Sequence, residues 1–344
     1  MKSKSFQGKL AVVTGAGSGI GRALVLDLAR QGCKVAACDI QQEAVEETVA
    51  LAGGGRDDRG DDQGDDRVRA YVFDVSDREA FFGHADMIKS DFGQPANLIV
   101  NNAGVGLGAS VREMRWEDFE WLMGINFWGV CYGTRAFLPQ LIESGDGHVV
   151  NVSSIYGMIS GPLTSAYNAA KFGVRGYTEA LRIEMRAEGL PVAVSCVHPG
   201  GIRTNIAKSS RLATNAGLDQ ADFAKWFERI TLTTPDKAAA IIVDGIRRNR
   251  PRILVGPDAH VIDLMQRTLG IRYQWVAGAL LNPLMYGKSR KTTAASTAAS
   301  PTSEAAPPPA AAKPAAKAKA PRKRAAKAAK PTAGSVEAEP EGAA

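Results

Sequence analysis

Short apolar runs alternate with longer amphipathic stretches along the chain up to about residue 255. Apolar runs rich in β-branched residues are typical of strands buried on both faces of a parallel sheet. Such strands are expected at residues 9–14, 34–39, 97–101, 148–152, 192–197 and 252–255. Helices are expected at residues 22–31, 77–92, 116–143 and 165–188. Strands and helices in alternation predict an α/β fold whose ligand lies at the carboxyl ends of the strands.

A glycine-rich turn follows the first expected strand. Thr14 ends that strand, and Gly15-Ala16-Gly17-Ser18-Gly19-Ile20-Gly21 leads into the helix at residues 22–31. A strand, a glycine turn and a helix in this order direct backbone N–H groups and a helix N-terminus at a pyrophosphate. The spacing differs from the usual dinucleotide fingerprint, so an ordinary glycine-rich turn is the alternative.

The second expected strand ends in an acidic residue, Asp39. A carboxylate about twenty residues past the glycines accepts hydrogen bonds from an adenosine ribose and repels a 2′-phosphate. The three residues after it are uncharged, and so is Ser18 in the turn. The sequence therefore predicts NAD rather than NADP, unless Arg22 or Arg56 reaches the same place. A second alternative is that Asp39 caps the following helix.

Tyr167 and Lys171 lie four residues apart, and Ser154 precedes Tyr167 by thirteen residues. In a helix, residues i and i+4 share a face, which would set the ammonium beside the phenol. A phenol titrates near pH ~10, and a neighbouring positive charge lowers its pKa toward the working range. The pair alone is a weak signal, and the other motifs make it a candidate catalytic site.

These motifs, in this order, resemble those of the short-chain dehydrogenase/reductase family over about residues 6–255. The resemblance implies a single doubly wound Rossmann-type domain with a parallel sheet, and oxidoreductase activity. The motifs that carry it are Thr14-Gly15-(x)3-Gly19-x-Gly21, Asp74-Val75, Asn101-Asn102-Ala103-Gly104, Asn126, Ser154, Tyr167, Lys171, Pro199-Gly200 and Thr204.

The resemblance also assigns roles to the catalytic residues. Tyr167 is expected to act as general base and acid, and Lys171 to lower its pKa and bind the nicotinamide ribose. Ser154 is expected to bond the substrate oxygen, and Asn126 to hold a water that connects Lys171 to solvent. The alternative for Asn126 is a bond to a neighbouring backbone. Tyr156 is expected to line the substrate pocket with Ser154 and Tyr167.

Residues near the cofactor are expected at the ends of several strands and in the helix at residues 165–188. The set is Thr14, Gly15, Ser18, Gly19, Ile20, Gly21, Asp39, Asp74, Val75, Asn102, Ala103, Gly104, Tyr167, Lys171, Pro199, Gly200, Ile202 and Thr204. His198 is interpreted as a strand-end residue near the nicotinamide. The four histidines have no metal-ligand spacing, so no metal site is predicted.

Residues 204–234 occupy the position of the substrate lid in this family and are rich in large apolar side chains. The expected substrate is therefore a hydrophobic secondary alcohol or ketone. Two alternatives stay open: an NADPH-dependent ketoacyl-type reductase, and a non-catalytic nucleotide-binding scaffold tethered by its basic tail. By resemblance, a homodimer or homotetramer is expected to form through the fourth and fifth helices of the fold, at residues 116–143 and 165–188.

The end of the chain differs in composition from the rest. Residues 288–344 contain 11 Lys+Arg and 4 Asp+Glu, a net charge of +7, with no aromatic residue. The catalytic domain is therefore expected to span residues 1–287, followed by a disordered tail. The tail is expected to increase the solubility of the protein. The alternative is weak contact with polyanions or membrane surfaces. Without an aromatic residue to stack on bases, it predicts no sequence-specific nucleic-acid recognition.

Further segments concern the surface and the compartment. Residues 53–67 carry three Asp-Asp pairs and are expected to form a solvated surface loop. Four unpaired cysteines and the lack of a signal peptide or membrane span predict a cytoplasmic protein. The apolar run at residues 275–285 could contact a membrane interface, cover the substrate cleft or pack against another subunit.

Overall fold

The computed structural model describes residues 5–53, 67–204, 206, 210–212 and 231–286. All of them belong to one compact unit, Met1–Ala295. The expected tail at 288–344 lies outside the described residues, as does the acidic loop at 53–67 except for its two end residues. The lid at 204–234 is described only in part. The domain boundary at residue 287 stays a prediction.

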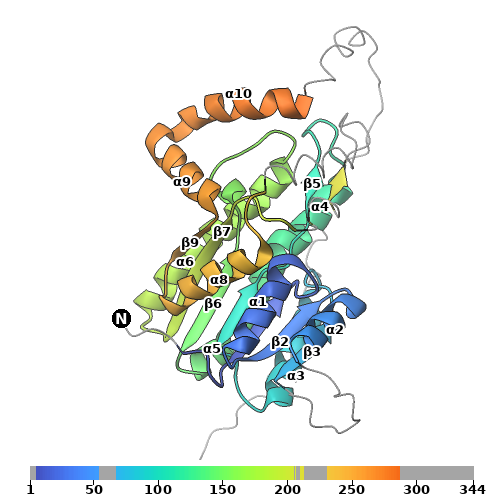
Figure 1. Ribbon diagram of the computed structural model, residues 1–344, viewed down its shortest axis with the longest axis vertical. Coiled ribbons are helices and arrows are strands. Elements are labelled where there is room, and N and C mark those ends of the chain that lie inside the picture. Colours follow the sequence, from blue (N-terminus) through green and yellow to red (C-terminus); the bar gives the residue numbers. More distant parts are fainter. Residues whose placement is uncertain (1–4, 54–66, 205, 207–209, 213–230, 287–344) are drawn as a thin grey trace, which may run out of the picture. The chain divides into compact units, whose positions relative to one another are not determined.

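A seven-stranded parallel sheet in the order β3-β2-β1-β4-β6-β7-β9 forms the centre of the fold (Figure 1). The strand order changes direction between β1 and β4, which is the switch point of a doubly wound sheet. The predicted fold class is therefore confirmed. The strands are β1 (Leu10–Thr14), β2 (Lys34–Asp39), β3 (Val68–Val72), β4 (Leu98–Asn101), β6 (Gly147–Val152), β7 (Val192–Pro199) and β9 (Arg252–Val255).

Helices cover both faces of the sheet, and α1 and α8 lie side by side on one of them (Figure 1). In β1, Ala11 and Val13 face the core cluster under α1, α2 and α8, whereas Leu10 and Val12 face the cluster under α3, α5 and α6. Burial on both faces explains why the strands are continuously apolar. These helices are α1 (Gly19–Arg30), α2 (Gln42–Leu51), α3 (Arg78–Phe92), α5 (Gly129–Glu143), α6 (Ser165–Ala187) and α8 (Pro235–Arg247).

Local signals fix where the helices begin and end. Asp77 precedes α3, and its carboxylate accepts a hydrogen bond from Ala80 N at 3.0 Å. Gly93 follows α3 with φ of +62°, the left-handed conformation that suits glycine at a helix end. Thr234 caps α8, and Pro235 occupies its first turn.

The stretch expected as one helix at residues 116–143 contains a local irregularity. A π-helical turn, η1 (Gly124–Trp128), joins α4 (Trp116–Met123) to α5. Single π-turns within helices are frequent at functional sites. This one carries Asn126, so the backbone is irregular at a candidate catalytic residue.

The remaining described elements are short or lie after the sheet. They are β5 (Leu107–Gly108), η2 (Ile155–Gly157), β8 (Arg211–Leu212), α9 (Pro257–Leu269), η4 (Gly270–Arg272) and α10 (Tyr273–Tyr286). No helix in the described ranges is long and apolar enough to cross a membrane. The four cysteines are free thiols; three are buried, and Cys131 is partly exposed.

Candidate active site

The glycine turn joins β1 to α1 at the carboxyl end of the sheet. Gly15 has φ of +67°, which L side chains rarely adopt. A Cβ on Gly21 would lie only 1.9 Å from the Gly15 carbonyl oxygen. Within the described chain, the N-cap Ser18 makes no side-chain capping bond. The first N–H groups of α1, which have no intrahelical acceptor, therefore keep their hydrogen-bonding capacity for an anion.

Asp39 lies directly beside this turn. Its carboxylate accepts hydrogen bonds from Gly17 N at 2.8 Å and from Gln41 N at 2.9 Å. The N-cap of α2 is Gln41, so Asp39 steadies the glycine turn rather than capping the helix. A carboxylate has about four acceptor positions, which leaves capacity for ribose hydroxyls.

Arg22, the nearby cation considered in the sequence, is already engaged. Its guanidinium donates to Gly17 O at 2.6 Å and forms an ion pair with Glu47, also at 2.6 Å. A further bond reaches Thr48 Oγ1 at 3.0 Å. The Arg22 guanidinium is therefore occupied by bonds within the protein, and the Glu47 carboxylate offsets its charge. Arg56 lies outside the described residues.

Thr14 connects the end of β1 to the end of β4. Its hydroxyl oxygen accepts from the backbone N–H groups of Asn102 at 3.0 Å and Ala103 at 3.1 Å. Asn102 Nδ2 in turn donates to Thr14 O at 2.9 Å. A Cβ on Gly15 would touch Ala103 Cα at 2.8 Å. The two strand ends are therefore fixed against each other with almost no free space between them.

Asp74 and Val75 follow β3 at the same edge of the sheet. Asp74 Oδ1 accepts from the backbone N–H and the hydroxyl of Ser76, both at 2.8 Å. Val75 packs against Gly129, where a Cβ would lie 3.1 Å from a valine methyl group. The chain after β3 is thus fixed in place, and the predicted adenine contact of these residues stays a prediction.

Ser154, Tyr167 and Lys171 meet where β6 ends and α6 begins. The Ser154 hydroxyl accepts from Tyr156 N at 3.1 Å and also hydrogen-bonds to the Tyr167 phenol. The Tyr156 ring stands edge-on to the Tyr167 ring, with centroids 6.2 Å apart. Lys171 Nζ lies 5.7 Å from the centroid of the Tyr167 ring. The structure therefore brings together residues that are seventeen positions apart in sequence.

Burial controls the ionisation of this pair. Lys171 is 3% exposed, and its ammonium donates to Val152 O at 3.0 Å. Burial lowers the pKa of Lys171 to about 8. Burial also raises the pKa of Tyr167 to about 12, although the Ser154 hydrogen bond acts in the opposite direction. In the protein alone, burial thus outweighs the lowering of the phenol pKa that was predicted from the lysine charge.

Asn126 bonds the backbone beside the lysine. Its Oδ1 accepts from Val105 N and its Nδ2 donates to Val105 O, both at 2.8 Å. A Cβ on Gly104 would lie 3.3 Å from Asn126 Oδ1 and 3.6 Å from Lys171 Nζ. This is the backbone contact that the sequence left open as the alternative. The water-holding role of Asn126 stays a prediction.

The loop after β7 starts at Gly200 and returns toward the glycine turn. A Cβ on Gly19 would lie 3.1 Å from Thr204 Cγ2, so the start of the predicted lid contacts the N-terminus of α1. Ile202 is buried and bridges to Thr233. Ile206 and residues 210–212 are described beyond this point, and most of the lid is not.

Asp258 holds this loop and was not identified from the sequence. A Cβ on Gly200 would lie 2.2 Å from the Asp258 carboxylate. The same carboxylate accepts from Gly201 N at 2.6 Å. Gly256-Pro257-Asp258 marks a helix start with an acid in its first turn, which was the available signal. The sequence could not show that the acid would serve a loop 57 residues away.

His198 lies behind the catalytic serine. The ring is fully buried, and Nδ1 lies 2.9 Å from the Ser154 carbonyl oxygen. Burial lowers the pKa of His198 to about 4, so the imidazole is neutral at pH 7. A neutral ring bonded to a backbone carbonyl positions Ser154, which agrees with its interpretation as a strand-end residue.

A buried polar network joins the elements that carry the catalytic residues. This network was also not identified from the sequence. Asn101 Nδ2 donates to Asn151 Oδ1 at 2.8 Å, and Asn151 Nδ2 donates to Thr178 Oγ1 at 3.0 Å. Thr134 lies 3.2 Å from Asn101 Nδ2. The network joins β4 and β6 to α5 and α6, and so fixes the strands and helices that carry the catalytic residues.

The sequence pattern of short chain dehydrogenases matches residues 9–215. The chain belongs to this family. It is 45% identical over 277 residues to SadH of Mycobacterium tuberculosis, which is named as an oxidoreductase, covering 80% of this chain and 96% of SadH. It is 30% identical over 269 residues to epidermal retinol dehydrogenase 2 of Mus musculus, covering 78% and 81% of the two chains.

A solved structure agrees with the fold. A short chain dehydrogenase/reductase from Burkholderia phymatum, crystallised in complex with NAD, superposes with a TM-score of 0.68 at 30% identity. The match covers 79% of this chain and 96% of that one. As a member of this family, the protein is an oxidoreductase, and the likeness supports a nicotinamide cofactor.

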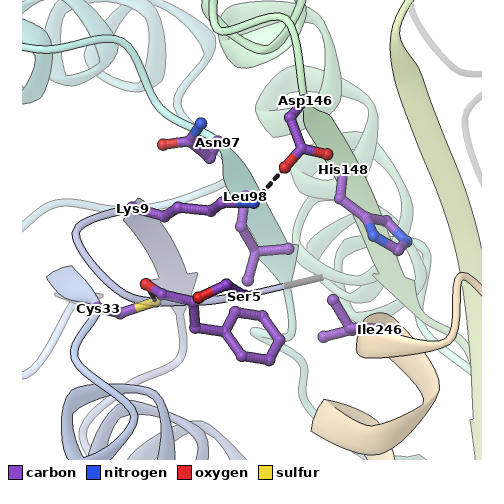
Figure 2. Close-up of a pocket in the computed structure, with 9 residues that line it drawn as sticks. Ser5, Lys9, Cys33, Asn97, Leu98, Asp146, His148 and Ile246 are labelled. Carbon is purple, nitrogen blue, oxygen red and sulfur yellow. Dashed lines mark hydrogen bonds and ion pairs between the residues drawn. The ribbon is translucent and has the colours of Figure 1, made fainter. Parts of the chain in front are cut away.

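A small cavity of this short-chain dehydrogenase lies at the amino ends of the strands (Figure 2). The catalytic residues follow the carboxyl ends of the strands. Lys9, just before β1, forms an ion pair with Asp146, just before β6. Cys33, Leu98 and His148 lie around them. Its volume of about 10 Å³ holds at most one water, so this cavity has no room for a substrate. Among the described residues, no cluster of His, Cys, Asp or Glu could hold a metal ion.

Proposed function

We propose that this short-chain dehydrogenase transfers a hydride reversibly between NAD and a hydrophobic secondary alcohol or its ketone. The supporting observation is the convergence of Ser154, Tyr167 and Lys171 next to the glycine turn. Gly104 connects the glycine turn to the catalytic residues. It lies beside Lys171, and it follows Asn102 and Ala103, whose backbone N–H groups bond Thr14.

The residues at the strand ends fit a dinucleotide. The N-terminus of α1 would hold the pyrophosphate, and the tight turn at Gly15 and Gly21 lets the phosphate approach the backbone. Asp39 would bind the adenosine ribose. The remaining contacts follow the family pattern: Asp74 and Val75 on the adenine side, Gly104, Tyr167 and Lys171 near the nicotinamide ribose, and Pro199, Gly200, Ile202 and Thr204 over the nicotinamide.

The preference for NAD rests on charge. Asp39 places a carboxylate where a 2′-phosphate would have to bind, and like charges repel. Arg22, the described cation on that side, is paired with Glu47. An NADP-binding site needs a cation free to face the phosphate, and Arg22 is not free in this way. These contacts support NAD over NADP.

In the proposed reaction, the Tyr167 phenolate would take the proton from the hydroxyl oxygen of the alcohol, and the carbon that carries this oxygen would lose its hydride to the oxidised nicotinamide. In the reverse direction, the Tyr167 phenol returns that proton to the ketone oxygen. The Ser154 hydroxyl donates a hydrogen bond to this oxygen and steadies the charge that develops there. When bound, the nicotinamide supplies hydride chemistry and, in its oxidised form, a positive charge.

A pKa of about 12 for Tyr167 is too high for a base at neutral pH. Lys171 supplies one positive charge within 6 Å of the ring, and a bound cationic nicotinamide would add a second. Both charges favour phenolate over phenol and oppose the effect of burial. Asn126 would then hold the water through which Lys171 passes the proton to solvent.

The substrate class follows from the side chains around the phenol. Met158 and Leu163, which follow Tyr156 in the chain, are buried, and Tyr167 itself packs against an apolar cluster that includes Leu107 and Leu122. The mouse relative is named for retinol, an apolar alcohol. An apolar wall excludes polyols, whose hydroxyl groups would lose their hydrogen bonds to water.

Self-association through α5 and α6 belongs to the same proposal. Trp128, the last residue of η1, is 49% exposed and stacks on Tyr132 of α5. Phe172 and Ile183 are exposed along α6. Large apolar side chains on two helices of one face support burial against a second copy.

The experiment is a panel of secondary alcohols, from polyols to long-chain and cyclic apolar compounds, assayed with NAD and NADP at 340 nm. Wild-type enzyme should turn over the apolar members with NAD. Tyr167→Phe should lower turnover by about 10²–10⁴-fold, as expected when a general acid–base group is lost. Tyr156→Phe is the matched control, because it removes a neighbouring phenol and should keep at least a tenth of the activity.

Three results would contradict the proposal. Folded Tyr167→Phe enzyme with near wild-type turnover would exclude the phenol as the base. Activity confined to polyols would exclude the apolar pocket, and a preference for NADP would favour the ketoacyl-type alternative. Tight NAD binding without turnover on any alcohol would favour a nucleotide-binding scaffold.

A further inference from the structure

The C-terminal helices of the unit expose large apolar side chains to solvent. On α9, Val261 is 66% and Leu264 is 63% exposed. One turn apart at the junction of η4 and α10, Ile271 is 73% and Trp275 is 84% exposed. These four residues are called the apolar patch below. Scattered single residues of this kind are normal on a protein surface, but four within fifteen positions mark an interaction surface.

The same helices are firmly packed on their other side. Ile262, Met265, Tyr273 and Ala277 form one cluster with Ile159. The Tyr273 hydroxyl also accepts from the backbone N–H of Ser160 at 3.0 Å. The exposure of the apolar patch is therefore not a consequence of loose helices. The opposite face of these helices packs against the chain that follows the catalytic serine. This packing keeps the apolar patch on the solvent side of the helices.

Positive charge accompanies the apolar patch. Arg272 lies within it in sequence and is exposed, whereas the charge of Arg267 is offset by an ion pair with Asp263 at 2.9 Å. Three basic residues follow α10 directly, at positions 288, 290 and 291. Further on, residues 313–330 contain eight Lys and Arg and no acid. An apolar surface thus precedes a long polybasic segment in the same chain.

We propose that the apolar patch and the basic segment after it dock this protein on the surface of an anionic phospholipid bilayer. Apolar side chains enter the boundary between headgroups and acyl chains, and cations are drawn to the negative surface. Each signal alone gives weak, reversible binding, and the two together give stable attachment. Both signals are present here, one in the structure and one in the sequence.

Charge argues against the other partners of such a patch. A second copy on this surface would add another chain with a net charge of +7 over residues 288–344, and like charges repel. Nucleic acid would satisfy the cations but leave Ile271 and Trp275 in water. An anionic bilayer satisfies both the apolar and the basic groups.

The location also suits the substrate, a point that rests on the proposed function. The helices of the patch contact Ile159 and Ser160, which follow Ser154 and Tyr156 in the chain. Docking through the patch would bring the substrate side of the site to the bilayer, where apolar alcohols dissolve. The test of docking below does not depend on activity.

The experiment is co-sedimentation of the full-length protein with sucrose-loaded vesicles of phosphatidylcholine alone or with 30% phosphatidylglycerol. Wild type should bind the anionic vesicles at least tenfold more tightly than the neutral ones. The double variant Ile271→Ser with Trp275→Ser should lose at least tenfold in affinity for the anionic vesicles. Changing the eight cations at 313–330 to Gln should remove most of the preference for phosphatidylglycerol.

Trp116→Ser is the matched control, because Trp116 is 76% exposed on α4 and lies outside the patch. It should bind as wild type does. Wild-type protein that stays in the supernatant, or patch variants that sediment as wild type does, would overturn the proposal. So would a lower oligomeric state of the patch variant in analytical ultracentrifugation, which would make the patch a contact between subunits.

Discussion

The Lys171 ammonium lies 5.7 Å from the centroid of the Tyr167 ring, yet its hydrogen bond goes to the Val152 carbonyl oxygen at 3.0 Å. The cation is therefore held by the sheet rather than by the phenol, at the end of β6. Its pKa of about 8, against the usual 10.5, reflects the free energy spent on burying it. A buried cation kept at this cost points to a functional role.

Replacing this cation should change how stability depends on pH. The folded pKa of Lys171 lies below its unfolded value, so between pH 8 and 10.5 the unfolded chain binds more protons, and wild-type stability rises with pH. Lys171→Met lacks this contribution to the pH dependence of stability. The free energy of unfolding of wild type minus that of Lys171→Met should thus rise by about 3 kcal/mol across this window.

Urea unfolding of both proteins at pH 7, 8, 9 and 10 measures this difference, and groups common to both cancel. Activity should fall by at least a hundredfold in Lys171→Met. Lys237→Met is the control, because Lys237 lies in the first turn of α8 and is exposed. A constant difference across the pH range would mean that Lys171 is not desolvated.

Much of the fold follows from the apolar pattern alone. Strands β2 and β9 have the bounds predicted from sequence, because each is a short apolar run bounded by turns. The helix expected at 116–143 has the right ends, but periodicity gave no sign of the π-turn at Gly124–Trp128. A π-turn adds one residue to a helical repeat, which leaves the apolar pattern nearly unchanged.

The parts of the site that sequence could not supply depend on contacts distant in the chain. Asp258 bonds Gly201 across 57 positions, and Asn101 bonds Asn151 across 50. Neither partner can be identified before the fold is known. The pKa of Tyr167 was predicted to fall because its charged neighbour is local in sequence, whereas the burial that raises it depends on the whole structure.

Asp39 should control the choice of cofactor. Asp39→Ala removes the carboxylate that would bind the ribose and leaves Gly17 N without its acceptor, so KM for NAD should rise by about 10–100-fold, from the loss of 1.5–3 kcal/mol of charged hydrogen bonds. KM for NADP should fall, because the repulsion is gone. Asp39→Asn can still accept from Gly17 N and so separates the loss of charge from disturbance of the turn. Steady-state kinetics with both cofactors measure the ratio; an unchanged ratio in both variants would place the ribose elsewhere.

The buried network should be important for stability rather than chemistry. Asn151→Ala deprives Asn101 and Thr178 of their partners in the core, and should lower the free energy of unfolding by about 2–5 kcal/mol. Thr134→Val removes longer contacts, of 3.2 and 3.4 Å, and should cost less. Both are measured by urea unfolding, together with turnover per folded molecule. A loss of turnover in fully folded Asn151→Ala would instead give this network a part in positioning the catalytic residues.

His198 should make the protein sensitive to acid. Its folded pKa of about 4 lies below the usual 6.5, so as pH falls through this window the unfolded chain binds a proton that the folded protein resists. Relative to His198→Asn, wild type should lose about 3 kcal/mol of stability between pH 6.5 and 4. The control His260→Asn, at an exposed position of α9, should keep the wild-type pH dependence. If His198→Asn shows the same pH dependence of stability as wild type, the His198 ring is protonated in the folded state. It then cannot be the neutral partner of the Ser154 carbonyl.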